Sequence, residues 1–157
     1  MSAQTQHSTA AVPFPSTEWF VALAQIMNSD EEHWRRLGYV DCAGTFSIID
    51  APGGDRHYRM EFDGYRCAAV REVADALVGD PAFVLEGDMD TWRHMLEHIA
   101  SNGRARLDQT LNALSIAGAP LRVWSADPLG RDMFFRYNQT FQDLFDRSAT
   151  ITTEYVS

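Results

Sequence analysis

The chain has 157 residues, of which 45% are hydrophobic, and this composition suits one globular domain with a single substantial core. Its formal net charge of -9 and the absence of any basic run argue against nucleic acid or an anionic membrane surface as a standing partner. All 13 cationic residues are arginine, which excludes Schiff-base chemistry and a phosphate-loop lysine.

Residues 1–13 are mostly small and polar and indicate a flexible N-terminal tail. They lack the positive and hydrophobic segments of a leader peptide, and no apolar run in the chain reaches membrane-spanning length. Cys42 and Cys67 lie far apart and outside any metal-binding or disulfide pattern, so we expect two reduced thiols, with a bridge between them as the less favoured alternative. We therefore predict a cytoplasmic protein without stable membrane insertion.

Two helices are predicted at the start of the folded part. Ser16 can cap a first helix, and Ser29 with Glu32 forms a capping-box signature for a second, short helix. The second helix runs to Leu37 and ends at Gly38. The apolar residues that recur at helical spacing in the first helix are Trp19, Phe20, Leu23, Ile26 and Met27.

From Asp41 onward the hydrophobic period changes from helical to alternating, which predicts β-strands. A turn over 51–55 joins the first two strands into a hairpin with one wet face. The apolar face of this hairpin carries Phe46, Ile48, Tyr58, Met60 and Phe62. A turn at Asp63-Gly64 then leads into a third strand over 65–73.

The segment 82–99 carries the most information about function. A short apolar strand over 82–86 passes through a tight Gly87-Asp88 corner into an amphipathic helix. The apolar residues are Phe83 and Leu85 on one strand face and Trp92, Met95, Leu96 and Ile99 on one helix face. Such joined faces must either close on each other as core or leave a slot that an apolar molecule fills.

Beyond this helix, residues 104–109 are expected to form a short helix or a loop, and 111–118 is predicted as a further strand with Leu114 and Ile116 facing inward. Asp127-Pro128 then begins one last helix. Its apolar stripe carries Phe134, Tyr137, Phe141, Leu144 and Phe145. The C-terminal tail over 148–157 is either an edge strand or disordered, which leaves one domain over 14–147.

This order of elements resembles the sterol-carrier-protein type-two family of lipid-binding domains. The family pattern is a strand, a glycine, a helix bearing Trp, a loop of small residues, and a strand that ends in glycine. The matching segments are 83–87, 90–96, 102–105 and 114–118, and the opening at 16–19 resembles the stand-alone bacterial members. The resemblance implies an α+β fold whose mixed, largely antiparallel sheet of about five strands is covered on one side by helices, with an apolar cavity between them.

Two features depart from the family pattern. The segment 124–127 and the very aromatic helix after it differ from the smaller, Met- and Leu-rich end of the carriers. They leave open how large the tunnel is, and whether it is open at all. The resemblance brings no catalytic residues and no cofactor.

Two motifs could carry chemistry. His94, Glu97 and His98 match the H-x-x-E-H spelling of inverted zinc peptidases. Because the apolar stripe takes the buried side of this helix, we expect these residues on a solvated face and predict no metal site. The carboxylates next to apolar strands are expected in turns or on the polar face of the sheet, and they are Asp41, Asp50, Glu61, Asp63 and Glu86.

These observations favour a domain that binds or carries an apolar small molecule, such as a fatty acid, an acyl chain, a sterol or a similar lipid-like metabolite. The alternative is a cofactor-independent pocket enzyme, an isomerase, cyclase or dehydratase, that uses a carboxylate or histidine in an apolar cavity. A third hypothesis is an interaction module whose last helix docks on a partner or, in a homodimer, on a second copy.

The expected ligand-binding residues come from the apolar faces of the strands and of the middle and last helices. They are Phe62, Phe83, Leu85, Trp92, Met95, Leu96, Leu114, Ile116, Phe134, Tyr137, Phe141 and Phe145. The four residues of the last helix are expected to form a movable lid over a wall made by the others.

Overall fold

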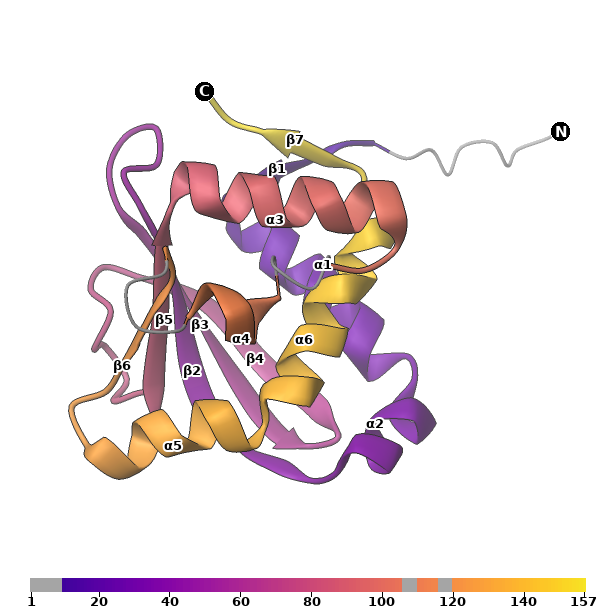
Figure 1. Cartoon of the computed structure of the whole chain (residues 1–157), viewed down its shortest axis with the longest axis vertical. Coiled ribbons are helices and arrows are strands. Elements are labelled where there is room, and N and C mark those ends of the chain that lie inside the picture. Colours follow the sequence, from indigo (N-terminus) through magenta and orange to yellow (C-terminus); the bar gives the residue numbers. More distant parts are fainter. Residues whose placement is uncertain (1–9, 106–109, 116–119) are drawn as a thin grey trace, which may run out of the picture.

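The structure is a computed structural model that describes residues 10–105, 110–115 and 120–157. Figure 1 shows a main sheet with helices gathered on one of its faces. A second, two-stranded sheet joins the two ends of the described chain. This arrangement confirms the predicted α+β class.

The main sheet contains five strands, in the order β4-β3-β2-β5-β6. They are β2 (Val40–Ile49), β3 (Arg56–Gly64), β4 (Arg66–Val73), β5 (Phe83–Asp88) and β6 (Arg122–Trp124). β2 and β5 run parallel, and the other three neighbouring pairs are antiparallel, as the largely antiparallel prediction requires. The predicted apolar face of the β2–β3 hairpin is buried, with Phe46, Ile48, Tyr58, Met60 and Phe62 at most 3% exposed.

The helices are α1 (Thr17–Asn28), α2 (Glu31–Leu37), α3 (Met89–Asn102), α4 (Leu111–Leu114), α5 (Pro128–Arg136), α6 (Asn138–Asp146) and the 3-10 helix η3 (Arg147–Thr150). The hydroxyl of Ser16 accepts a hydrogen bond from the Trp19 backbone N–H, so the predicted cap of α1 is confirmed. α2 ends at Gly38, whose φ of +114° suits glycine.

The predicted capping box at the start of α2 is wrong. α1 continues to Asn28, so Ser29 closes α1 and its hydroxyl donates to the Ile26 carbonyl at 2.8 Å. Asp30 takes the N-cap position of α2 and makes no side-chain capping hydrogen bond. Ser29 is therefore the C-cap of the longer helix α1 and not the N-cap of α2.

The predicted strand over 111–118 is also wrong. Residues 111–114 form α4, in which the buried Leu111 and Leu114 share one helix face, and Ile116 lies outside the described residues. The fifth strand is β6, after Pro120. A short Leu-Asn-Ala-Leu run fits a helical turn as well as a strand, so its packing decides between the two.

The last helix is interrupted. Asp127 caps α5 as predicted and accepts from the Leu129 N–H at 3.0 Å, but the chain changes direction at Tyr137 and continues as α6. α5 packs against β5, and α6 packs against α1, α3 and η3. Across this break, Phe134 of α5 and Phe141 of α6 stack on each other with their ring centroids 5.8 Å apart.

The two-stranded sheet pairs β1 (Val12–Phe14) in parallel with β7 (Thr153–Tyr155). Part of the predicted C-terminal tail is therefore a strand, and residues 12 and 13 of the predicted N-terminal tail pair with it. Residues 1–9 lie outside the described part of the chain. In the part that the structure describes, no helix is long and apolar enough to cross a membrane.

Candidate functional site

The candidate site is the layer between the main sheet and the helices. Of the 11 predicted binding residues that the structure describes, 10 are buried, and Tyr137, where α5 meets α6, is half-buried. The buried ones are Phe62 on β3, Phe83 and Leu85 on β5, Trp92, Met95 and Leu96 on α3, Leu114 on α4, Phe134 on α5, and Phe141 and Phe145 on α6. Alternation and helical spacing thus predicted the buried faces of the strands and of α3, α5 and α6, whereas Leu114 is buried on a helix and not on the predicted strand.

Aromatic rings of the sheet and of the last two helices meet directly in this layer. The ring of Phe83 has its centroid 5.3 Å from that of Phe134 and 5.3 Å from that of Phe141. Phe62 also lies 5.3 Å from Phe141. These are contact distances for aromatic pairs. The rings that were expected to stand apart around a ligand are therefore in contact with one another.

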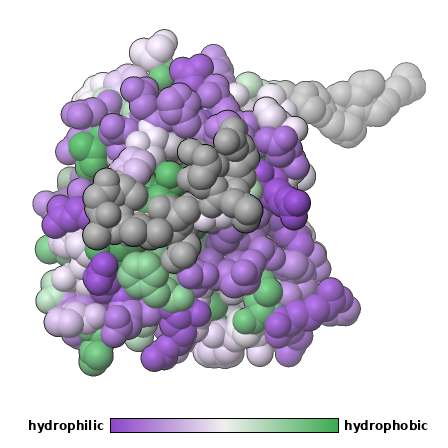
Figure 2. All heavy atoms as spheres, in the orientation of Figure 1, coloured by the Kyte–Doolittle hydropathy of each residue, from purple (hydrophilic) through white to green (hydrophobic). Residues whose placement is uncertain are grey.

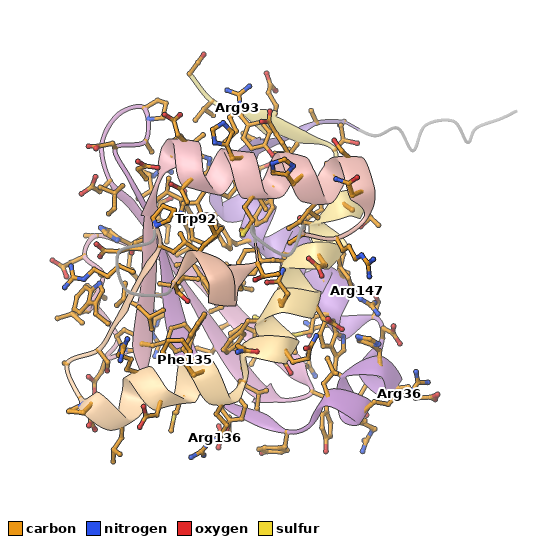
Figure 3. The ribbon with its side chains drawn as sticks, in the orientation of Figure 1. Arg36, Trp92, Arg93, Phe135, Arg136 and Arg147 are labelled. Carbon is orange, nitrogen blue, oxygen red and sulfur yellow. The ribbon has the colours of Figure 1, made fainter. Side chains whose placement is uncertain are left out.

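Trp92 joins α3 to the sheet and to α6. Its indole Nε1 donates a buried hydrogen bond to the carbonyl of Ser47 on β2 at 3.0 Å. Its ring centroid lies 5.7 Å from that of Phe145. Figure 3 shows Trp92 on the side of α3 that faces the sheet and Arg93 on the other side. The indole therefore fixes the position of the helix as well as contributing apolar surface.

Phe46 is a central residue that the predicted site omitted. Its ring centroid lies 5.9 Å from that of Phe83 and 5.3 Å from that of Phe145. Phe20 of α1 reaches the same cluster and stacks on Tyr58 at 4.6 Å. The alternation in β2 had placed Phe46 on the apolar face, but only the packing of α1 and α6 shows that it lies in the middle of the core.

The interior of the described structure holds hydroxyl groups and no buried charged side chain. Its buried polar residues are Thr45, Ser47, Ser115, Thr140 and Ser148. Burial raises the pKa of Tyr58 to about 12, so this phenol stays neutral. A general acid or base in this layer would need a titratable group there, and the described residues supply none that ionises near neutral pH.

The geometry agrees with two solved structures. One is a crystal structure of sterol carrier protein 2, with 18% identity and a TM-score of 0.64 over 87% of this chain and 97% of that one. The other is a conserved hypothetical protein of Thermus thermophilus, described as a candidate sterol carrier protein, with 15% identity and a TM-score of 0.62 over 88% and 90% of the two chains. This chain has the sterol carrier protein 2 fold. A scan against protein-family models and a search of curated proteins found no match.

Two pockets lie at the rim of the sterol carrier protein 2 fold and touch the predicted wall. Leu96 lines one of about 500 Å³ between α3 and the C-terminal residues 148–155. Phe62 lines one of about 400 Å³ beside the β2–β3 hairpin, together with Asp41, Glu61 and Asp63. Burial, and to a lesser degree the charge of Asp41, raises the pKa of Cys42 in the second pocket to about 12, so its thiol is a poor nucleophile.

The carboxylates near the strands lie where the sequence placed them. Asp41 and Asp63 are exposed near one end of the hairpin, and Asp50 lies in the turn at its other end. Glu86 accepts a hydrogen bond from Trp124 Nε1 at 2.7 Å and lies near Arg122. Among the residues that the structure describes, no three His, Cys, Asp or Glu side chains gather as a metal-binding group.

Proposed function

We propose that this protein binds and carries an apolar small molecule, such as a fatty acid, an acyl chain, a sterol or a similar lipid-like metabolite, between its sheet and helices. The observation that carries the proposal is the pair of facing aromatic surfaces, Phe62 with Phe83 on the sheet and Phe134 with Phe141 on the helices, in a layer without buried charge. The sterol carrier protein 2 fold supports it. Both cysteines are free, as suits the cytoplasmic location that we also propose.

Binding would require the two aromatic surfaces to separate. We infer that α5 and α6 move, because they are two short helices that, with the junction between them, carry all four of the proposed lid residues. The lid residues are Phe134, Tyr137, Phe141 and Phe145. Each methylene that a ligand buries between lid and sheet would contribute about 0.8 kcal/mol. A hydrocarbon chain could thus offset the loss of the ring contacts.

The apolar interior favours carriage over the alternative of an acid–base enzyme. Such an enzyme needs a carboxylate or histidine inside its pocket. Among the residues that the structure describes, the fully buried side chains include no carboxylate and no histidine, so the layer offers no group of this kind.

A titration with a fluorescent fatty acid tests the proposal. The full-length protein should bind it saturably, and native mass spectrometry of protein purified from a heterologous host should show a retained lipid. Phe141→Ala removes the ring that faces both Phe62 and Phe83, so we expect its dissociation constant to change at least about tenfold. Trp34→Phe is the matched control, because Trp34 is a buried aromatic residue of α2 outside the proposed wall.

Two results would count against the proposal. One is the absence of saturable binding by the folded wild type. The other is a Phe141→Ala variant that remains folded by circular dichroism and binds as tightly as the Trp34→Phe control. Either result would mean that the aromatic layer is only the structural core of the domain.

A further inference from the structure

His94 and His98 lie one turn apart on α3 and line the same pocket of about 500 Å³. His94 is exposed and His98 is half-buried. The C-terminal segment forms the opposite wall of this pocket with Ser148, Ile151, Thr153 and Tyr155. The two histidines were expected on a solvated helix face, and the structure adds that both border one groove.

These two imidazoles differ from the other histidines that the structure describes. His33 lies 3.0 Å from a carboxylate oxygen of Asp143, and His57 lies 2.7 Å from the hydroxyl of Ser47. Within the described residues, the rings of His94 and His98 have no hydrogen bond or ion pair. Their nitrogens are therefore available to a ligand from solution.

We infer that His94 and His98 form a two-histidine site for a divalent transition-metal ion. Side chains at positions i and i+4 of a helix project from the same face, which is how helical metalloenzymes present a histidine pair. Imidazole nitrogen suits Zn²⁺, Ni²⁺ and Cu²⁺.

The site is open. Glu97, between the two histidines, is paired with Arg93 through a contact of 3.1 Å. No group of three His, Cys, Asp or Glu side chains gathers in the part of the chain that the structure describes. Water or an added ligand in the groove would therefore fill the remaining coordination positions, as in metal sites that exchange a ligand. This inference does not rest on the proposed function. α3 turns Trp92 toward the sheet (Figure 3), and of the proposed ligand-binding residues only Leu96 is among those that line this pocket.

Isothermal titration of the full chain with NiCl₂ at neutral pH, in a buffer without amines, tests the inference. The wild type should bind one Ni²⁺ per chain at this site. His94→Gln and His98→Gln should each weaken binding at least about tenfold, because each removes one of two protein ligands. His7→Gln is the control for histidine outside the described residues and should bind like the wild type.

A second variant tests the spacing. His98→Gln combined with Ser101→His keeps two histidines on α3 but moves them two turns apart, so it should bind as weakly as His98→Gln alone. Ni²⁺ should also raise the melting temperature of the wild type and leave that of the His94→Gln/His98→Gln variant unchanged. Equal binding by the wild type and this double variant, loss of binding in His7→Gln, or no Ni²⁺ binding by the wild type would each overturn the inference.

Discussion

Gly44 allows the ring of Phe83 to lie across β2. The two residues are partners in the parallel pairing of β2 with β5. A Cβ atom at Gly44 would lie 2.2 Å from Cζ of Phe83, far inside van der Waals contact. The ring cannot simply turn away, because Phe134 and Phe141 pack against it. A residue without a side chain is thus a condition for the aromatic contacts between sheet and helices.

Gly44→Ala should therefore destabilise the protein by about 1–3 kcal/mol through overpacking. Phe83→Leu should create room for the new methyl group. In the Phe83→Leu background we expect the cost of Gly44→Ala to fall by at least about 0.5 kcal/mol, which is coupling between neighbouring residues. Urea unfolding of the four proteins in this double-mutant cycle measures the coupling. Additive effects would show that the ring of Phe83 is not what excludes a side chain at position 44.

The predictable part of the candidate site was the direction of each side chain. Period-2 alternation placed Phe62 and Phe83 inward, and helical spacing did the same for Trp92. The separation between these faces could not be predicted, because periodicity gives a direction and not a distance. Whether rings close on each other or surround a ligand depends on how far α5 and α6 stand from the sheet.

At the scale of elements, Asn28 connects the end of α1 to the edge strand β4. Its amide Nδ2 donates to the Cys67 carbonyl at 2.9 Å, and its Oδ1 accepts from the Cys67 N–H at 2.8 Å. The pairing of β3 with β4 shifts register between Glu61 and Phe62, near this point. The side chain of Asn28 thus satisfies both backbone groups of one strand residue, as a neighbouring strand would.

Asn28→Asp should lower the free energy of unfolding by about 1–3 kcal/mol at neutral pH. The carboxylate can still accept from the Cys67 N–H, but it cannot donate to the carbonyl, and the two oxygens repel each other. Asn102→Asp is the matched control, since Asn102 is exposed at the end of α3 and its amide donates to the His98 carbonyl. Chemical denaturation measures the free energy of unfolding of both variants. An equal decrease in the two variants would contradict a special role for Asn28.

Elements with a long or strictly periodic pattern of hydrophobic residues were predicted well, and the short elements were not. β3 shows clean alternation, and α3 carries a full apolar stripe between Asp88 and Gly103, which cap it. The fifth strand was predicted at 111–118, although Leu121, just before the true strand, and Val123 within it also alternate with polar or half-buried neighbours. The break at Tyr137 has no Gly or Pro to mark it, and the apolar stripe continues across it, so the sequence predicted one helix where there are two.

On the scale of the whole molecule, apolar residues are concentrated inside and charge is concentrated outside. On the face of the molecule that is turned to the viewer, Figure 2 shows a mainly hydrophilic surface with apolar residues in separate spots. The first and last described segments help to close the core, since Trp19 Nε1 donates to the Thr153 hydroxyl at 3.0 Å and Phe14 packs against Tyr155. Titratable groups that are buried inside the molecule couple its stability to pH.

Cys67 shows this coupling most directly. The residue is 3% exposed, and burial raises the pKa of its thiol from 9.0 to about 11. Between these values the unfolded chain loses the thiol proton and the folded chain keeps it. The unfolded state therefore binds fewer protons, and the free energy of unfolding falls as the pH rises. The contribution of Cys67 is fully present below pH 9 and is lost progressively up to about pH 11.

Cys67→Ala should remove this part of the alkaline slope, which is about 1.4 kcal/mol per pH unit for one group. Urea unfolding of both proteins under reducing conditions, at steps from neutral pH to about pH 10.5, measures the difference. The variant should have the lower free energy of unfolding at neutral pH, because it loses buried sulfur. Above pH 9 the free energy of unfolding of the wild type should fall more steeply, so the difference between the two proteins should become smaller. Two stability curves that stay parallel over this range would mean that the thiol ionises as easily in the folded protein as in the unfolded chain.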